Sequence, residues 1–397
     1  MIKIAVIGFG NIGGGLVELV ERNKDIIAKD CGTEVEVKYI VDIRDFKGHP
    51  LENKIIKDFN VVLNDPEVSI VAEMIGGSHP AFDFSIAALK AGKHVVSSNK
   101  EVVANFGEQL LAAAAENKVA YLFEASVGGA IPIIRPMRES LSSDDILSVN
   151  GILNGTTNFI LTNMLYKGKS FDDALAEAKA LGYAEANPSA DVDGIDACRK
   201  ICILAALAYG VIYPCDSVST EGIRNITERD ASDAAELGAS IKLIGHAEKT
   251  EEGKVLISVC PRVIPSDVPL SNVNDVFNGI MVSGKAVGDL MFYGRGAGSL
   301  PTAGAVLADI VEIIKHIPSG QLPPSKWTRG EGSELADAKA AVSKFYCRVK
   351  GNAVPAGAVE VIQKYGETAI VTDAISEYAL DEMTKGFEVV SKIRYFA

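Results

Sequence analysis

The chain lacks any apolar run long enough to cross a membrane, and it lacks an excess of positive charge. Apolar residues make up 48% of its 397 residues, but no run approaches the ~20 residues that a membrane-spanning helix needs. It opens on a short strand-like segment and not on a signal peptide, so we expect a cytoplasmic location. The formal net charge of −13 disfavours nucleic acid and anionic membranes as partners.

Cysteine and histidine are too few and too scattered to indicate a disulfide framework or a transition-metal site. The six cysteines show no framework spacing. Cys198 and Cys202 lie four residues apart in a helical pattern without matching histidines, which is typical of buried small apolar residues. The five histidines have no metal-ligand spacing. Any catalysis is therefore expected to proceed without a transition metal.

A glycine-rich turn lies close to the start of the chain. In IAVIGFGNIGGG, a short apolar strand is followed by a G-x-G-x-x-G spacing and a helical pattern over residues 12–20, and a second apolar strand, VEVKYIVDI, comes about 20 to 30 residues later. This context predicts a dinucleotide-binding turn with the pyrophosphate at the helix N-terminus. The alternative is a glycine-rich turn without a ligand. The candidate cofactor-binding residues here are Gly8, Gly10, Asn11, Ile12 and Gly13.

The residues after the second strand give opposing signals for NAD and NADP. Asp42 ends that strand, where an acid can bind the ribose 2′-hydroxyl of NAD. Arg44 and Lys47 follow directly and could hold the 2′-phosphate of NADP. The sequence leaves the choice open.

Strands and helices alternate through about residue 135, which predicts a parallel, doubly wound Rossmann sheet. Ligands bind beyond the carboxyl ends of the strands in such sheets. Ser98, Asn99 and Lys100 follow one strand, KHVVSSNK, at such an end. Lys100 is therefore a candidate active-site cation, and the alternative is a solvated lysine.

Beyond about residue 145 the pattern changes to an α+β domain with a largely antiparallel sheet. An uncharged polar run, Asn154 to Asn158, could line a pocket or form an ordinary turn. The segment PSGQLPPSK at 318–326 reads as a linker. We expect a nucleotide-binding domain at 1–135 plus about 300–325, a catalytic and dimerisation domain at 136–299, and a small C-terminal unit at 335–397.

The most informative segment is GYAEANPSADVDGIDACRK, residues 182–200, which precedes a strongly apolar helix. Its spacing predicts that the helix begins at Asp193 and Gly194 and runs to Gly210. Asp196 and Lys200 then leave the same helix face. The pair could be an ordinary ion pair, with Asp193 as N-cap. It could also form a catalytic ammonium held by a carboxylate, with Glu185 folding back over it.

Several motifs together resemble the homoserine dehydrogenase family over most of the first 320 residues. The segment from Ala178 to Lys200 carries the spacing of that family's signature. Further similar motifs are SNK at 98–100, EASVGGAIPII at 124–134, NGTTNFIL at 154–161 and YGRGAGSLPTA at 293–303. The resemblance implies NAD(P)-dependent interconversion of L-homoserine and L-aspartate 4-semialdehyde, in threonine, methionine and isoleucine biosynthesis.

The resemblance also implies roles for individual residues. Lys200 corresponds to the proton donor, and Lys100 to a lysine near nicotinamide and substrate that could share this role. Glu185 corresponds to the carboxylate that holds the substrate's amino group, Asp196 to a catalytic or orienting acid, and Asp191 to a further acid near the substrate.

By the same resemblance, the cofactor site includes Ser98, Lys100 and Gly296. A sodium-type cation is implied as well, and its ligands would be the Glu124 carboxylate and the backbone carbonyls of Val127, Gly129 and Ile131. A carboxylate with carbonyls is reasonable chemistry for a hard monovalent ion.

The C-terminal tail resembles a shortened ACT domain, a regulatory unit of βαββαβ order. The sequence pattern indicates only three strands over residues 335–397. Its loop GNAVPAG, residues 351–357, has no charged side chain to hold an amino acid's ammonium. We expect the tail to be an assembly element of a homodimer or higher homo-oligomer, with weak or no inhibition by threonine.

Two rival functions remain at this point. One is another amino-acid or semialdehyde dehydrogenase on the same scaffold. The other is a non-catalytic nucleotide or amino-acid sensor, which would have no need of Lys100, Glu185, Asp196 and Lys200 together.

Overall fold

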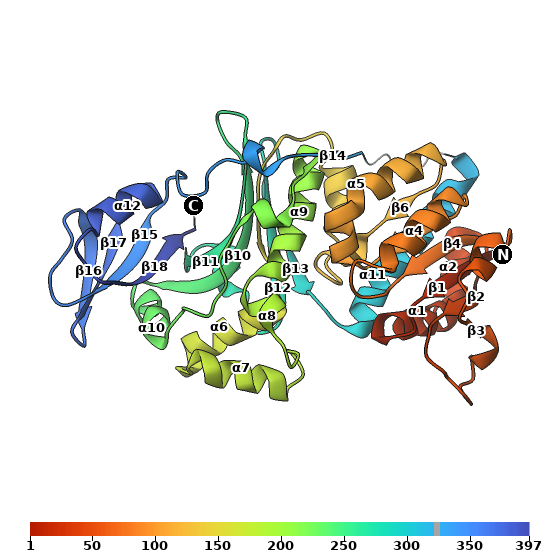
Figure 1. Cartoon of the computed structure of the whole chain (residues 1–397), viewed down its shortest axis with the longest axis horizontal. Coiled ribbons are helices and arrows are strands. Elements are labelled where there is room, and N and C mark those ends of the chain that lie inside the picture. Colours follow the sequence, from red (N-terminus) through yellow and green to blue (C-terminus); the bar gives the residue numbers. More distant parts are fainter. Residues whose placement is uncertain (321–325, 397) are drawn as a thin grey trace. The chain divides into compact units, whose positions relative to one another are not determined.

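The computed structural model describes residues 1–320 and 326–396, and these form two compact units (Figure 1). Unit 1 contains residues 1–143, 206–214 and 295–330, and unit 2 contains residues 144–205, 215–294 and 331–397. Part of the expected linker, residues 321–325, lies outside the described residues. Of the helices in the described ranges, none combines the length and apolar character that crossing a bilayer requires.

Unit 1 is built on a six-stranded sheet in the order β3-β2-β1-β4-β5-β6, and every neighbouring pair is parallel. Its strands are β1 (Ile2–Ile7), β2 (Val35–Val41), β3 (Ile55–Ile56), β4 (Val68–Glu73), β5 (His94–Ser97) and β6 (Tyr121–Leu122). Its helices are α1 (Asn11–Arg22), α2 (Lys24–Cys31), α3 (Asn60–Asn64), α4 (Ala81–Lys90), α5 (Lys100–Glu116) and α11 (Ser299–His316). Because the strand order reverses between β1 and β4, the sheet has the Rossmann switch point there, which confirms the predicted fold class.

The core of unit 1 joins the start of the chain to a segment near residue 310. Ile4 and Val6 of β1 pack in one buried cluster with Val306, Ile310 and Ile313 of α11. These residues recur at helical spacing, so α11 presents one apolar stripe to the sheet. A short parallel pair, β8 (Val211–Ile212) with β14 (Thr328–Arg329), also belongs to this unit.

Unit 2 is built on a ten-stranded sheet whose main path runs β13-β12-β7-β10-β11-β18-β15-β17-β16, with β9 beside β11. Its strands are β7 (Ile146–Ile152), β9 (Ser219–Thr220), β10 (Ala239–Lys249), β11 (Val255–Pro265), β12 (Phe277–Gly284), β13 (Gly288–Arg295), β15 (Phe345–Lys350), β16 (Ala358–Lys364), β17 (Glu367–Thr372) and β18 (Val389–Tyr395). Its helices are α6 (Gly155–Lys167), α7 (Phe171–Ala180), α8 (Ser189–Val192), α9 (Ile195–Tyr209, of which residues 206–209 belong to unit 1), α10 (Glu228–Glu236) and α12 (Glu377–Met383).

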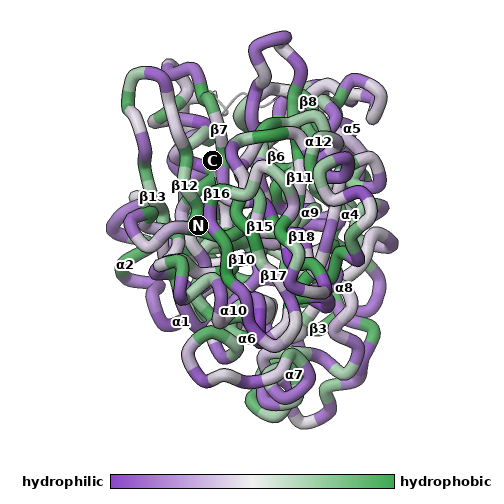
Figure 2. Tube along the Cα trace, turned by 90° about the vertical axis from the view of Figure 1, so that its left-hand side faces the viewer, coloured by the Kyte–Doolittle hydropathy of each residue, from purple (hydrophilic) through white to green (hydrophobic). Residues whose placement is uncertain are grey.

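The centre of this sheet is an unbroken antiparallel pair. β10 and β11 are each eleven residues long and pair from Ala239 with Pro265 to Lys249 with Val255. Figure 2 shows hydrophobic residues along β10 and hydrophilic residues in many peripheral loops. Helices α6 and α10 pack against β10, so the long strands fix the position of α6 and of its residues.

The described part of the C-terminal tail, residues 335–396 within unit 2, has four strands and one helix, so the expectation of three strands was wrong. β15, β16 and β17 follow one another, and α12 then leads to β18. The element that a βαββαβ order would have and this tail lacks is the first helix. The loop 351–357 takes its place and connects β15 directly to β16, because a segment with Gly351, Pro355 and Gly357 is a poor helix former.

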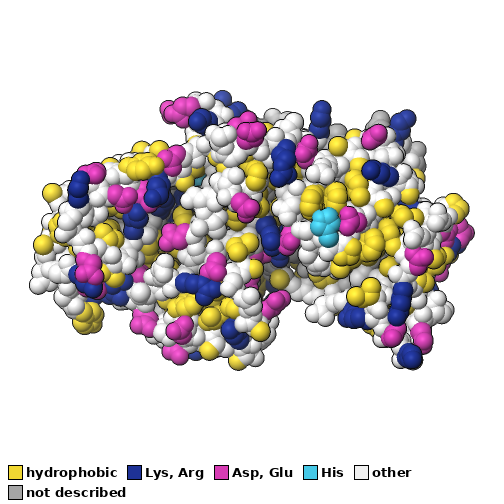
Figure 3. Space-filling model, viewed as in Figure 1, with side chains coloured by type: hydrophobic (Ala, Val, Ile, Leu, Met, Phe, Trp, Pro, Cys, Tyr) yellow, Lys and Arg dark blue, Asp and Glu magenta, His cyan; other side chains and the backbone are white. Residues whose placement is uncertain are grey.

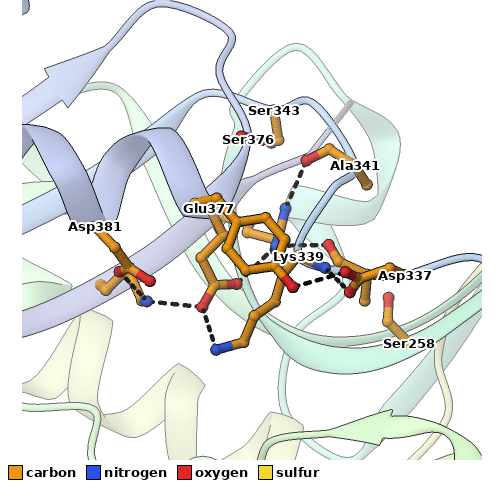
Figure 4. Close-up of polar contacts among 12 residues, drawn as sticks. Ser258, Asp337, Lys339, Ala341, Ser343, Ser376, Glu377 and Asp381 are labelled. Atoms are coloured by element: carbon orange, nitrogen blue, oxygen red, sulfur yellow. Dashed lines mark hydrogen bonds and ion pairs between the residues drawn. The ribbon is translucent and has the colours of Figure 1, made fainter.

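Polar contacts join α12 to β18 and to the segment before the C-terminal strands. Figure 4 shows Glu377, the first residue of α12, beside Lys339 and Asp381. The Glu377 carboxylate accepts hydrogen bonds from Lys392 Nζ at 2.7 Å and Arg394 Nη2 at 2.8 Å. β18 also pairs with β11 at Arg262 and Val263. The tail therefore continues the central sheet of unit 2.

Candidate functional site

The glycine turn of unit 1 has the geometry that a dinucleotide requires. Gly8 follows β1 with φ of +92°, and Gly10 is the N-cap residue of α1. A Cβ on Gly13 would lie 1.9 Å from the carbonyl oxygen of Gly8, so only glycine allows the helix to approach the turn so closely. A Cβ on Gly10 would meet open space. With Asn11 and Ile12 as the first residues of α1, the turn leaves room for a pyrophosphate at the helix N-terminus.

A second turn lies beside the first one. Ser299, the first residue of α11, donates a hydrogen bond from its hydroxyl to the backbone oxygen of Asn11 at 2.5 Å. The backbone nitrogen of Ala130 donates to the Arg295 oxygen at 3.2 Å, and a Cβ on Gly129 would lie 2.6 Å from the Gly296 oxygen. The structure therefore brings Gly296 into the neighbourhood of the glycine turn.

Asp42 and Arg44 form an ion pair at the end of β2. The Asp42 carboxylate accepts from Arg44 Nε at 2.9 Å and Nη2 at 2.8 Å, and from the backbone nitrogen of Phe9 at 2.8 Å. The hydrogen bond from the guanidinium holds the pKa of Asp42 far below its usual range. The acid that favours NAD and the cation that favours NADP thus bind each other, and the acid is also tied to the glycine turn.

The ends of β4 and β5 meet through polar side chains. Asn99 is the N-cap of α5, and its side-chain nitrogen donates to the backbone oxygens of Ile75 at 2.8 Å and Gly77 at 2.7 Å. The Ser98 nitrogen donates to the Glu73 backbone oxygen at 3.2 Å. Lys100 is the first residue of α5. The structure therefore brings Ser98, Asn99 and Lys100 to the carboxyl edge of the sheet, as predicted.

Glu73 is a buried carboxyl group that sequence reasoning missed. It ends β4 at the switch point, accepts from the Ser97 hydroxyl at 2.7 Å and from the Ile75 nitrogen at 2.7 Å, and is 0% exposed. Burial raises the pKa of Glu73 to about 7. A carboxylate within the apolar run VSIVAEMIGG was the available signal.

Lys200 and Asp196 form a buried ion pair on α9 of unit 2. Lys200 Nζ donates to Asp196 Oδ2 at 2.7 Å and to the Leu153 backbone oxygen at 2.8 Å. The two side chains are only 10% and 5% exposed. This burial argues against an ordinary surface pair, which would be solvated and would contribute little. A buried ammonium that is held on a carboxylate is a charged group in a low-dielectric setting.

Asn154 connects this pair to Asp191. Its side-chain nitrogen donates to Asp196 Oδ2 at 2.9 Å and to Asp191 Oδ1 at 2.7 Å. Its side-chain oxygen accepts from the Thr157 nitrogen, so Asn154 is also the N-cap of α6. The polar run at 154–158 was noted from sequence, but Asn154 itself was not assigned to the site. Asn154 reaches Asp191 and Asp196 only because the fold packs the start of α6 beside α8 and α9, which the sequence does not indicate.

Glu185 lies in the exposed loop between α7 and α8. Among the described residues, the hydrogen-bonded group of Lys200, Asp196, Asn154 and Asp191 does not include it. The loop is attached to α6 by a hydrogen bond from the Thr156 hydroxyl to the Tyr183 oxygen at 2.6 Å. The fold thus places the loop beside α6 and leaves the Glu185 carboxylate toward solvent.

Asp193 is not the N-cap of α9, and that expectation was wrong. The helix begins at Ile195, and the Gly194 oxygen accepts its first hydrogen bond, from the Cys198 nitrogen. Asp193 instead ends the short helix α8 and pairs with Arg224. The extra helical turn at 189–192 displaces the start of α9 by about one residue.

Glu124 is almost fully buried at 5% exposure and lies at the start of a helical turn. Its carboxylate accepts from the backbone nitrogens of Ile133 at 2.7 Å, Ile134 at 2.9 Å and Arg135 at 2.7 Å. Burial raises the pKa of Glu124. Val127 and Ile131 are buried in the same loop, and Gly129 has φ of +56°. Three backbone amides thus bind the carboxylate that the sequence suggested as a cation ligand, and the three residues suggested as carbonyl ligands lie in the loop that follows it.

The chain has a doubly wound nucleotide-binding domain and a second domain in which a carboxylate holds a lysine. This combination is typical of oxidoreductases that use a nicotinamide cofactor on a small-molecule substrate. The family models that match the chain are in agreement. The model for the homoserine dehydrogenase NAD binding domain matches residues 8–124, and the model for homoserine dehydrogenase matches residues 132–311.

Relatives with assigned activity match most of the chain. A homoserine dehydrogenase of Pseudomonas aeruginosa is 40% identical over 391 residues, which cover 96% of this chain and 89% of that one. That of Bacillus subtilis is 41% identical and covers 80% of this chain and 74% of that one. The crystal structure of a homoserine dehydrogenase from Thiobacillus denitrificans has a TM-score of 0.91 at 34% identity, with 100% of this chain and 98% of that chain covered. The chain belongs to the homoserine dehydrogenase family.

Proposed function

We propose that the chain reduces L-aspartate 4-semialdehyde to L-homoserine and catalyses the reverse oxidation, in the biosynthesis of threonine, methionine and isoleucine. The observation that carries this proposal is the buried Lys200–Asp196 pair at 2.7 Å, bridged to Asp191 by Asn154. The nicotinamide supplies or accepts the hydride when it is bound. The residues of the chain bind the substrate, orient its carbonyl and move the proton.

Lys200 is proposed as the proton donor to the aldehyde oxygen. Negative charge builds on that oxygen as the carbonyl is reduced, and an ammonium stabilises the charge and can deliver a proton. Asp196 and the Leu153 carbonyl fix the direction of the ammonium by two hydrogen bonds. In the oxidation, the neutral amine of Lys200 accepts the proton of the homoserine hydroxyl.

Glu185 and Asp191 are proposed to hold the substrate, with Glu185 binding its ammonium group. The exposed position of Glu185 in a loop supports this role, since a solvated carboxylate can close over a ligand. Asp191 is held by Asn154 and can therefore keep one orientation. Lys100 is proposed to lie near nicotinamide and substrate, because it follows β5 at the carboxyl edge of the sheet.

The cofactor is NAD or NADP, and Arg44 is proposed to decide between them. The ion pair with Asp42 leaves the guanidinium side chain 57% exposed, where a 2′-phosphate could draw it away from the acid. A solved structure of a hyperthermophilic archaeal homoserine dehydrogenase, with a TM-score of 0.68 at 29% identity, is in complex with NADPH. Arg44→Ala should raise KM for NADP+ and leave KM for NAD+ nearly unchanged. Equal changes for both cofactors would remove Arg44 from this role.

A monovalent cation is proposed at Glu124 and the carbonyls of Val127, Gly129 and Ile131. Glu124 Oε2 accepts one backbone hydrogen bond, and a carboxylate oxygen has a further lone pair for a cation. The test is the thermal unfolding midpoint in sodium and in choline chloride at equal ionic strength. A difference that Glu124→Gln removes supports the site, and identical midpoints contradict it.

The C-terminal unit is proposed to serve assembly of a homodimer or higher homo-oligomer. The sheet of unit 2 ends in β13 and β16, and these strands expose Met291, Tyr293, Val359 and Val361. The loop 351–357 offers no charged side chain to an amino acid. Light scattering tests the oligomer. Activity of the full chain with L-threonine tests regulation, and strong inhibition would contradict an assembly role alone.

The decisive experiment is spectrophotometric turnover of L-homoserine with NAD+ and NADP+ in parallel, together with the reverse reaction. Turnover of homoserine above that of other hydroxyl-bearing amino acids supports the proposal. Efficient turnover of a different hydroxy amino acid or semialdehyde, or none at all with intact folding, favours the rival functions.

A further inference from the structure

Three cysteines converge in unit 2 at a point outside the residues proposed for catalysis. Cys198 and Cys202 lie on α9, and Cys215 begins a short 3-10 turn, Cys215–Ser217, in the following segment. Their sulfur atoms all lie within 4.8 Å of one another. From sequence, Cys198 and Cys202 are separate small apolar residues, and only the fold adds the third thiol. Cys198 and Cys202 are 3% and 0% exposed, whereas Cys215 is half-buried.

We infer that these three thiols form a binding site for a thiophilic divalent cation of the zinc class. Zinc binds thiolate sulfur at about 2.3 Å, so three sulfurs around one ion lie about 4 Å apart. The observed separation of at most 4.8 Å needs only a small contraction. Soft thiolate ligands select such ions over magnesium or calcium.

Polar and charged groups also act on the three thiols. The Cys198 thiol donates to the Cys215 backbone oxygen at 3.6 Å, which orients it within the group. A hydrogen bond from Cys202 lowers the pKa of Cys198, and hydrogen bonds with Cys198 raise the pKa values of Cys202 and Cys215. The positive charge of Arg199 lowers the pKa values of Cys198 and Cys215, and it would partly offset the added thiolate charge.

Binding proceeds without any change of oxidation state. Three S–H bonds break, three metal–sulfur bonds form, and three protons pass to solvent. The affinity must therefore rise with pH, because each ligand binds only as the thiolate. The half-buried Cys215 marks the side from which an ion can enter.

The test uses the full chain and Cd²⁺ as probe, since cadmium thiolates absorb in the ultraviolet. We expect one Cd²⁺ per chain, with the absorption of thiolate ligands, and competition by Zn²⁺. Loss of a residue that hydrogen-bonds to a metal ligand already costs about 10- to 100-fold in affinity. Replacing a ligand itself, as in Cys215→Ser, should therefore weaken binding by at least about tenfold. Cys260→Ser, at a half-buried cysteine of the same unit, should leave affinity unchanged.

Thermal unfolding keeps the test independent of folding defects. Cd²⁺ should raise the unfolding midpoint of the unaltered chain and of Cys260→Ser, and should leave that of Cys215→Ala unchanged. Absence of the absorption, equal affinity in Cys215→Ser, or equal stabilisation of Cys215→Ala would overturn the inference. Rapid formation of a disulfide among these cysteines in air, seen as a loss of two mass units, would also overturn it, because the thiols would then pair instead of binding an ion.

Discussion

Unit 2 buries two lysines, and they differ in what holds the ammonium. Lys200 on α9 is held by the Asp196 carboxylate and one backbone carbonyl. Lys242 on β10 is 0% exposed, and its Nζ donates to Asn158 Oδ1 at 3.1 Å, Asn274 Oδ1 at 2.9 Å and the Val273 oxygen at 2.6 Å. One ammonium is hydrogen-bonded to a carboxylate, and the other is hydrogen-bonded to neutral oxygens while Asp275 acts on it through its charge alone.

This difference is consistent with the chemical role proposed for Lys200 and with a packing role for Lys242. Burial lowers the pKa of Lys242 to about 7, because the neutral oxygens that bind it cannot offset the lost hydration of a charge. Lys242 connects the start of α6 to the loop before β12 and serves the packing of unit 2. Lys200 is bound at the junction of β7 and α6, and Asn154 connects its partner Asp196 to a second carboxylate, Asp191. Burial alone does not identify a functional lysine.

The largest effect is expected for Lys200→Ala. Loss of a positioned acid–base group costs about 10²- to 10⁴-fold in rate, and the Kd for the cofactor should hardly change. Steady-state kinetics of homoserine oxidation measure kcat, and fluorescence titration with the reduced cofactor measures its Kd. Lys169→Ala, at a partly exposed ion pair with Glu177, is the control. A variant that keeps more than half the kcat would remove Lys200 as proton donor.

Lys242→Met should affect stability and leave kcat of the folded protein within about twofold. Between pH 7 and the usual lysine pKa, the unfolded chain binds one proton more than the folded chain, so the unaltered protein gains stability as pH rises. The free energy of unfolding of the unaltered protein, minus that of Lys242→Met, should therefore rise by about 2 kcal/mol between pH 7 and pH 9. Urea unfolding at both values measures it. A constant difference would mean that Lys242 stays charged in the folded state.

Asn154→Ala should combine the two kinds of effect. Loss of the N-cap of α6 costs about 1 kcal/mol, and loss of the hydrogen bonds to Asp191 and Asp196 should also reduce kcat, because the carboxylate beside Lys200 loses its fixed orientation. Ser170→Ala removes the N-cap of the neighbouring helix α7 and should lower stability alone. Equal decreases of kcat in Asn154→Ala and Ser170→Ala would mean that Asn154 acts only as a helix N-cap.

The smallest effect is expected for Glu185→Gln, which keeps the shape and removes the charge. A charge-assisted hydrogen bond is about twice as strong as a neutral one, so KM for homoserine should rise several-fold while kcat stays nearly constant. Glu177→Gln, on the surface of α7, is the control. An unchanged KM for homoserine would assign Glu185 to the loop's structure.

Local patterns in the sequence determined a large part of this protein. The spacing around Gly8 and Gly13, and the strand–helix alternation after it, predicted the doubly wound domain, because turn chemistry and hydrophobic period act over a few residues. Asp196 and Lys200 were predicted to share a helix face for the same reason. The signature from Ala178 to Lys200 predicted the family.

Only the tertiary structure decided which distant residues meet and what each meeting does. It brought Asn154 between Asp191 and Asp196, buried Glu73 at the switch point and gave the tail its fourth strand, which no local pattern had indicated. It also gathered Cys215 with Cys198 and Cys202, and it gave two buried lysines different partners. The reason is physical: helix period and turn type depend on neighbours in sequence, whereas burial, counter-charge and hydrogen-bond partners depend on segments that the fold brings together.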